Sequence, residues 1–87
     1  MEARNHQFER EAIPHRSLIQ SAATRLMGDP FRGEDITQEV YLNAWRSFER
    51  YTPGTNCKAW LFRILWHTVR HYHRREQRYS QIPEDSE

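Results

Sequence analysis

The sequence predicts an all-α fold, a compact bundle of three main helices of which the first is broken near Pro14. Apolar residues recur every three or four positions along three long segments, which is the helical period. Clusters of proline and glycine separate these segments. Strand signals are nearly absent, because Val40 and Val69 are the only valines and no stretch alternates apolar with polar residues. A length of 87 residues suits a single domain, which we expect over residues 1–79.

The first segment is expected from about His6 to Met27. Proline is tolerated in the first turn of a helix but not in its interior, so a short helix should precede Pro14 and a longer one should begin there. The sequence Gly28-Asp29-Pro30 is expected to stop this helix and turn the chain. The predicted apolar stripe of the longer helix is Leu18, Ile19, Ala22, Ala23, Leu26 and Met27.

The second helix is expected from about Gly33 to Tyr51, and the third from an N-cap at Asn56 to about Tyr79. A polar turn with Pro53-Gly54 at its centre separates them. Residues 80–87 are polar and acidic and are expected to form a linker or tail. The predicted inner faces are Ile36, Val40, Tyr41, Ala44, Trp45 and Phe48 in the second helix, and Leu61, Ile64, Leu65, Thr68, Val69 and Tyr72 in the third.

Composition excludes several classes of protein. The single cysteine, Cys57, allows no internal disulfide. The absence of a long apolar run or a signal peptide predicts a cytoplasmic protein with no membrane contact. There is no glycine-rich phosphate loop and no catalytic constellation, so no enzyme activity and no cofactor are expected. His67 and His71, with His73 nearby, form an incomplete ligand set without a carboxylate, so no metal site is expected either.

The third helix is expected to present a basic and aromatic outer face. Residues 58–78 contain six basic side chains and one acidic one, a net charge of +5. The helical period places Arg63, Trp66, His67, Arg70 and Arg74 opposite the inner face. A solvated charged surface would explain the arginines, but an indole on it favours nucleic acid. Arginine attracts phosphates and aromatic rings stack on unpaired bases, so single-stranded nucleic acid is the expected ligand.

The second helix is expected to present an acidic outer face. Residues 34–49 contain four acidic side chains and one basic one, a net charge of −3. Leu42 lies near the centre of a face that also contains Asp35, Gln38 and Glu39. This pattern fits either an ordinary solvated surface or a protein interface with a small apolar centre and a polar rim.

Two motifs together resemble region 2 of ECF-type bacterial sigma factors. Gly28-Asp29-Pro30 followed by the run from Glu34 to Trp45 is similar to the family pattern "GD…(A/E)ED(L/I)xQExFLxAW". Phe48, Tyr51 and Gly54, followed by the run from Ala59 to Leu65, are similar to "F…F…G…xxWLxRIA". The resemblance covers roughly residues 15–79 and implies the fold of sigma region 2.

The resemblance also implies partners. Family region 2 docks on the clamp helices of the RNA polymerase β′ subunit, through positions that match Asp35, Gln38, Glu39 and Leu42. It opens the promoter −10 element, captures a flipped base of the non-template strand in the loop corresponding to 51–58, and contacts further bases and phosphates with the following helix. The candidate DNA-binding residues are therefore Tyr51, Asn56, Lys58, Trp60, Arg63, Trp66, His67, Arg70, His71 and Arg74.

Departures from the family pattern fall on the expected DNA-reading face. His67 stands where the family commonly has asparagine, and His71 replaces a later Asp or Asn, so the preferred −10 sequence is expected to differ. We expect the family's helix-turn-helix domain, region 4, to be missing from this sequence, which makes the chain either a fragment that ends at an interdomain linker, the interpretation we favour, or an unusual one-domain protein. The main alternative is a sigma-like protein-binding module that engages polymerase or an anti-sigma factor without opening DNA. A duplex-reading repressor ranks below it, because no helix-turn-helix or dimerising element is visible.

Overall fold

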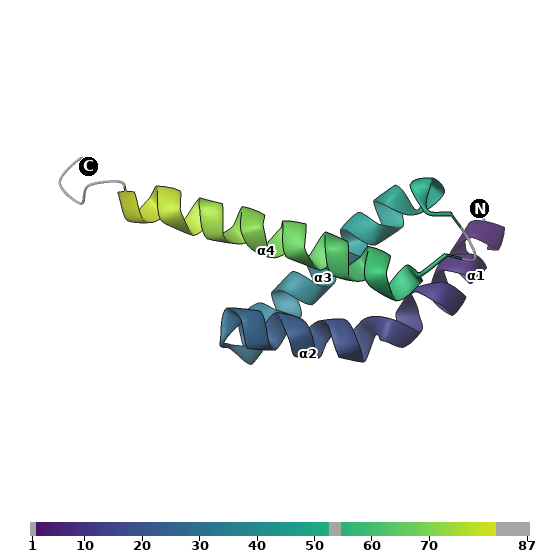
Figure 1. The fold of residues 1–87 in the computed structure, drawn as a ribbon, viewed down its shortest axis with the longest axis horizontal. Coiled ribbons are helices and arrows are strands. Elements are labelled where there is room, and N and C mark those ends of the chain that lie inside the picture. The colour runs from purple at the N-terminus through teal and green to yellow at the C-terminus, as the bar shows by residue number, and fades with distance from the viewer. Residues whose placement is uncertain (1, 53–54, 82–87) are drawn as a thin grey trace.

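The computed structural model describes residues 2–52 and 55–81, and all regular structure within them is helical. The elements in chain order are α1 (Glu2–Glu11), the 3₁₀ turn η1 (Ile13–His15), α2 (Arg16–Met27), α3 (Pro30–Ser47), the 3₁₀ turn η2 (Phe48–Arg50) and α4 (Cys57–Gln81). Figure 1 shows α2 and α3 joined at a tight turn, with α4 crossing α3 and α1 lying at the opposite end from that turn. The predicted all-α bundle is confirmed.

The break near Pro14 is a single 3₁₀ turn. Pro14 lies at its start, where a missing N–H leaves no helical hydrogen bond unmade. The longer helix therefore begins at Arg16 and not at Pro14.

The turn between α2 and α3 is tighter than predicted, because Gly28 ends α2 and the next two residues, Asp29 and Pro30, already begin α3. Gly28 ends α2 in the left-handed conformation with φ of 70°, and its N–H donates to the Thr24 carbonyl over 2.8 Å. Asp29 is extended, and its Oδ1 accepts from the Phe31 N–H over 3.0 Å, which caps α3. Pro30 then occupies the first turn, where proline is favoured. The predicted start at Gly33 was therefore wrong by three residues.

α2 and α3 make the most extensive helix–helix contact of the fold, and Gly33 sets their closest approach. A Cβ on Gly33 would lie 2.7 Å from Thr24 Cα and even closer to Thr24 Oγ1. One turn later, the buried Thr37 hydroxyl donates to the Gly33 carbonyl over 2.7 Å, so that a polar side chain lies in the core without an unmet donor.

The core lies where α2, α3 and α4 meet, and α1 covers one end of it. The predicted inner faces of α3 and α4 are confirmed, whereas in α2 the burial centres on Ile19 and Ala23 and leaves Leu18 45% and Leu26 36% exposed. Those two leucines flank the buried stripe, and the small Ala23 sits where the helices approach. The buried apolar residues are Phe8, Ala12, Ile19, Ala23, Ile36, Val40, Ala44, Phe48, Tyr51, Cys57, Leu61, Leu65 and Val69.

α1 attaches to the C-terminal end of α3 through an aromatic cluster. Phe8 lies edge-on to Trp45 and Phe48, with ring centroids 5.4 and 5.2 Å apart. Arg4 lies over the Trp45 ring, 4.4 Å from its centroid, and donates to the Trp45 carbonyl over 2.7 Å. The same carbonyl accepts from the Phe48 N–H, so Arg4 adds a second hydrogen bond in the last turn of α3.

α4 is long and projects beyond the α2–α3 turn (Figure 1). Its helix reaches Gln81, two residues past the predicted end, and the rest of the predicted acidic tail lies outside the described residues. Within 2–52 and 55–81, no helix combines the length and the apolar character needed to cross a bilayer.

Candidate functional site

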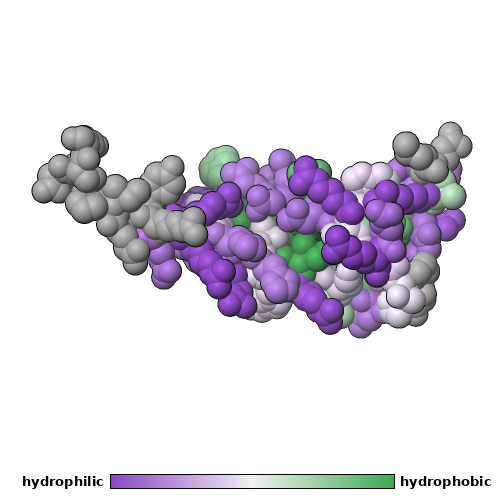
Figure 2. Space-filling view, turned by 90° about the horizontal axis from the view of Figure 1, so that it is seen from above, coloured by the Kyte–Doolittle hydropathy of each residue, from purple (hydrophilic) through white to green (hydrophobic). Residues whose placement is uncertain are grey.

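The basic stripe is the exposed row Arg63, His67, Arg70 and Arg74 on α4, and all four side chains are exposed as predicted. The spacing of four, three and four residues keeps the row on one side of the helix. At 1.5 Å per residue, the row extends about 16 Å along the helix axis. Guanidinium groups at these intervals can contact successive phosphates of one strand. Figure 2 shows a face of the molecule on which hydrophilic side chains dominate and surround a small apolar patch.

The loop pocket is a hollow of about 310 Å³ at the N-terminal end of the basic stripe. It is lined by Arg50, Tyr51, Thr52, Thr55, Asn56, Ala59, Trp60 and Arg63. The lining combines hydroxyl, amide and guanidinium groups with the apolar surface of Trp60 and Ala59, as sites for polar rings commonly do. Arg63 belongs both to this pocket and to the basic stripe, so the two form one continuous surface.

The structure assigns different surroundings to the four predicted DNA-binding residues near this pocket. Tyr51 is only 6% exposed and stacks on Phe48, which argues against direct stacking of its ring on a base. Trp60 is half-buried and packs 4.9 Å from Tyr51, ring centroid to centroid. Asn56 caps α4 as predicted, since its Oδ1 accepts from the Ala59 N–H over 3.0 Å. Lys58 is exposed, but its spacing of five residues from Arg63 points it to a different side of α4.

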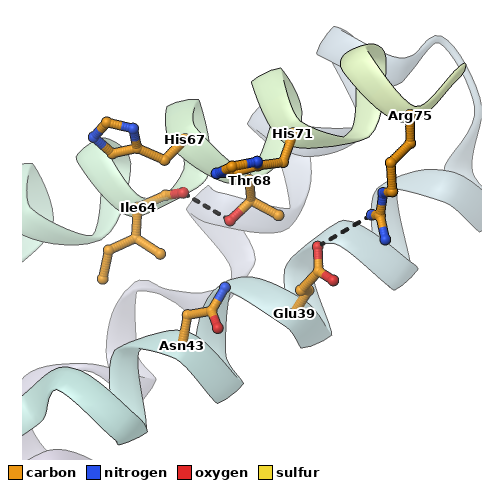
Figure 3. A pocket seen from close by; sticks show the side chains of 7 residues that line it. All are labelled: Glu39, Asn43, Ile64, His67, Thr68, His71 and Arg75. Carbon is orange, nitrogen blue, oxygen red and sulfur yellow. Dashed lines mark hydrogen bonds and ion pairs between the residues drawn. The ribbon is translucent and has the colours of Figure 1, made fainter. Parts of the chain in front are cut away.

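A second hollow, the α3–α4 groove, runs beside the basic stripe (Figure 3) and measures about 420 Å³. His67, Thr68, His71 and Arg75 line it from α4, together with Ile64, whereas Glu39 and Asn43 line it from α3. The Glu39 carboxylate lies 4.0 Å from the Arg75 guanidinium. The groove thus joins the predicted DNA-binding face of α4 to the predicted polymerase-binding face of α3.

Trp66 lies on the other edge of the basic stripe, toward α2. It is 53% exposed and lines a shallow, mostly apolar hollow of about 180 Å³ with Ala22, Arg25, Leu26, Phe62 and Leu65. Successive residues on a helix are 100° apart, so Trp66 and His67 face opposite flanks of the stripe. The prediction placed both residues on one outer face, whereas the structure places them on the two opposite edges of that face.

The outer face of α3 is open at three of its four predicted polymerase-binding positions. Asp35 and Gln38 are exposed, and Leu42 is 47% exposed between polar neighbours. Glu39 is half-buried by its contact with Arg75 across the groove. The four side chains share one side of the helix, as their spacing predicts.

Carboxylates on α3 are held by neighbouring cations and amides. Arg16 donates to Glu34 over 2.9 Å, and this hydrogen bond, followed by one from Gln38, lowers the pKa of the Glu34 carboxyl below its ordinary value. Glu34 thus ties α3 to α2. Burial raises the pKa of the Cys57 thiol, which favours the unreactive protonated form.

The three histidines do not converge. His67 and His71 line the α3–α4 groove, whereas His73 is 4.0 Å from Glu76 on its own helix. Across residues 2–52 and 55–81, no three His, Cys, Asp or Glu side chains gather closely enough to hold a metal ion.

Sequence reasoning missed several residues of these surfaces. Asn43 and Arg75 line the α3–α4 groove, and Thr52 and Thr55 line the loop pocket. Asn43 follows Glu39 on α3 by four residues, and Arg75 follows His71 on α4 by four residues. Helical spacing alone could therefore have placed each on the same face as its neighbour. Nothing in the local sequence distinguishes the two threonines.

Comparison with known proteins agrees with this architecture. The family described as sigma-70 region 2 matches residues 13–79. The ECF RNA polymerase sigma factor EcfG of Rhodopseudomonas palustris is 35% identical over 60 residues, which are 69% of this chain and 33% of that protein. SigE of Mycolicibacterium smegmatis is 36% identical over 73 residues, 82% of this chain and 28% of that protein. SigK of a Mycobacterium species is 38% identical over 50 residues, 56% of this chain and 26% of that protein.

The chain therefore spans a third or less of the length of these relatives. The family match begins at residue 13, so it includes the helices, the 3₁₀ turns and the loop that supply every surface described above, whereas α1 lies before it. The resemblance noted in the sequence is thereby confirmed: the chain belongs to the sigma-70 region 2 family, with the ECF RNA polymerase sigma factors as its relatives.

Proposed function

We propose that this chain is the promoter-recognition domain of a sigma factor. In this proposal the outer face of α3 binds the β′ clamp helices of RNA polymerase core, and α4 with the loop before it binds the non-template strand of the −10 element. The observation that carries the proposal is the continuity of the loop pocket with the basic stripe through Arg63. A pocket for one base at the end of a row of cations suits a single strand.

The energetics favour an unpaired strand over a duplex. Taking a base out of the stack costs a few kcal/mol, which contacts in a pocket must offset. Stacking on an aromatic side chain contributes about 1–3 kcal/mol per base. The half-buried Trp60 in the loop pocket supplies such a surface, and the arginines add phosphate contacts that weaken as salt rises.

The polymerase half of the proposal is tested with Leu42→Arg. Leu42 is 47% exposed, and burying the remainder of a leucine in an interface yields about 1 kcal/mol. A cation buried there without a partner costs more, so affinity for core polymerase should fall at least tenfold. Leu18→Arg is the matched control, because Leu18 is 45% exposed on α2. Equal affinities of Leu42→Arg and wild type in a calorimetric titration would refute the assignment.

The DNA half is tested in the presence of core polymerase, with fluorescent oligonucleotides that carry a −10-like element. Wild type should bind the non-template single strand better than the same duplex. Arg70→Gln should weaken that binding and reduce its salt dependence by about one phosphate contact. Arg10→Gln on α1 is the matched control, since Arg10 is exposed and lines none of the surfaces described above. Equal binding of duplex and single strand would refute base capture.

One observation favours a second candidate, a module that binds only proteins. The hollow beside Trp66 is mostly apolar and includes Leu26 and Phe62, which suits a protein contact such as an anti-sigma factor better than a phosphate chain. This alternative predicts that Arg70→Gln leaves the affinity for DNA unchanged, whereas Trp66→Ala lowers the affinity for the protein partner.

A further inference from the structure

Tyr51 lines the loop pocket and packs against two aromatic rings. Its ring stacks on Phe48, with centroids 5.5 Å apart and planes 16° apart. The Trp60 ring also lies against Tyr51, with centroids 4.9 Å apart and planes 42° apart. These contacts restrict the ring, and its hydroxyl makes the directional contacts that complete its placement.

The Tyr51 hydroxyl joins two segments that are far apart in the sequence. It lies 3.0 Å from Glu11 Oε1 at the end of α1 and 3.2 Å from the Thr55 carbonyl of the loop. Both partners are acceptors, so the single hydroxyl proton is shared between them. Burial, followed by the contact with Glu11, raises the pKa of Tyr51.

Thr55 in turn is bonded across the loop. Its N–H donates to the Thr52 carbonyl over 3.3 Å, and its hydroxyl donates to the same carbonyl over 2.6 Å. Thr52, Thr55 and Tyr51 all line the loop pocket. The hydrogen bond from Tyr51 to the Thr55 carbonyl therefore fixes two lining residues of the pocket relative to each other.

Glu11 can act as a fixed point because α1 is anchored independently of the loop. Arg4 binds the Trp45 carbonyl, and Phe8 packs against Phe48. The Tyr41 hydroxyl also donates to the Ala12 carbonyl over 2.7 Å, which ties the end of α1 to α3. Glu11 precedes residue 13, where the family match begins, so this contact belongs to a part of the chain outside the matched segment.

We infer that α1 positions the loop pocket through the Glu11–Tyr51–Thr55 contact, which makes Glu11 and Tyr51 positioning residues for recognition of the captured base. The inference rests on the proposed function and adds to it a determinant of base selectivity that does not touch DNA. Without the contact, Thr55 loses its link to α1 through Tyr51. Because the lining of the pocket is then less fixed, the pocket binds different bases with more similar affinities.

The test uses the 87-residue chain bound to core polymerase and a library of non-template oligonucleotides randomised over the −10 segment. The quantity measured is the ratio of affinities for the best and worst base at each position. Tyr51→Phe keeps the ring and removes the hydroxyl, and it should reduce this ratio about fivefold at one position only. Glu11→Ala should do the same, whereas Glu11→Gln should retain the ratio because its amide oxygen still accepts.

Thr37→Val is the matched control, since it also removes a buried hydroxyl bond to a backbone carbonyl but leaves both the loop and the anchors of α1 untouched. It should lower the melting temperature about as much as Tyr51→Phe and leave every ratio unchanged. The inference is overturned if Tyr51→Phe keeps the wild-type ratios, or if it lowers affinity equally for all sequences, which is what mere loss of stability would do. A wild-type chain without any base preference overturns the proposed function and this inference with it.

Discussion

Replacing Gly33 with alanine is expected to destabilise the domain, although alanine is the better helix former. In an exposed helix the change would stabilise by about 1 kcal/mol. Here the new Cβ would lie 2.7 Å from Thr24 Cα and 2.9 Å from Thr24 N. Both are backbone atoms of α2 and cannot rotate away, so α2 and α3 must separate. Overpacking of this kind costs typically 1–3 kcal/mol, and we expect the free energy of unfolding to fall by about 2 kcal/mol.

Urea unfolding followed by circular dichroism measures this change, and the melting temperature should fall by roughly 10 °C in a domain of this size. Adding Thr24→Ala removes the side-chain oxygen nearest to the new methyl group but not the backbone contacts. The double variant should therefore recover only part of the lost stability. If Gly33→Ala proves more stable than wild type, the close approach of α2 and α3 is wrong.

Four further predictions concern the binding surfaces and a buried tyrosine. His67→Asn should change the preferred −10 sequence more than the overall affinity, because an amide offers a donor and an acceptor in a different arrangement from an imidazole; identical preferences in a promoter-library selection would remove His67 from the reading face. Trp66→Ala should weaken DNA binding alike for all sequences, by about 1–3 kcal/mol if the indole stacks on a base, and unchanged DNA binding would assign Trp66 to a protein contact. Glu39→Gln should release Arg75 and raise DNA affinity severalfold at low salt, since exposed ion pairs contribute about 0–1 kcal/mol; a lowered affinity would contradict the pairing. Burial raises the pKa of Tyr41 to about 12 in the folded chain, against about 10 in the unfolded chain. The contribution of the neutral Tyr41 hydroxyl to the free energy of unfolding is therefore complete below about pH 10 and is lost as the pH rises toward about 12. Tyr41→Phe should reduce this alkaline loss of stability in unfolding measured across that pH range.

The fold was largely predictable because helical periodicity reports burial directly. The inner faces of α3 and α4 followed from spacing alone, and Asn56 was recognised as a cap from its chemistry. The start of α3 was missed because Gly28-Asp29-Pro30 looks like a terminator, although Asp29 and Pro30 are equally good initiators. The exposure of Leu18 and Leu26 depends on how closely α2 and α3 approach, which a single helix pattern does not contain.

The candidate site was predictable along each helix and not between helices. Arg63, His67, Arg70 and Arg74 were placed on one exposed face by their spacing. The link from Glu39 to Arg75 and the link from Tyr51 to Glu11 join residues 36 and 40 positions apart, and no local pattern reports such pairs. The same holds for the burial of Tyr51, which the family resemblance placed among the candidate DNA-binding residues.

The projection of α4 beyond the α2–α3 turn has a consequence for how salt titrations are interpreted. Past Tyr72, the described side chains of α4 lie over no core, and that stretch is attached to α3 by Arg32 with Glu76 and by Arg75 with Glu39, over 3.6 and 4.0 Å. Added salt weakens these attachments as well as the phosphate contacts of Arg74. The end of the helix should then fray, and its amide protons should exchange faster with solvent as ionic strength rises. A slope of log affinity against log salt would therefore overstate the number of phosphates bound, unless amide exchange of the same segment is measured in parallel.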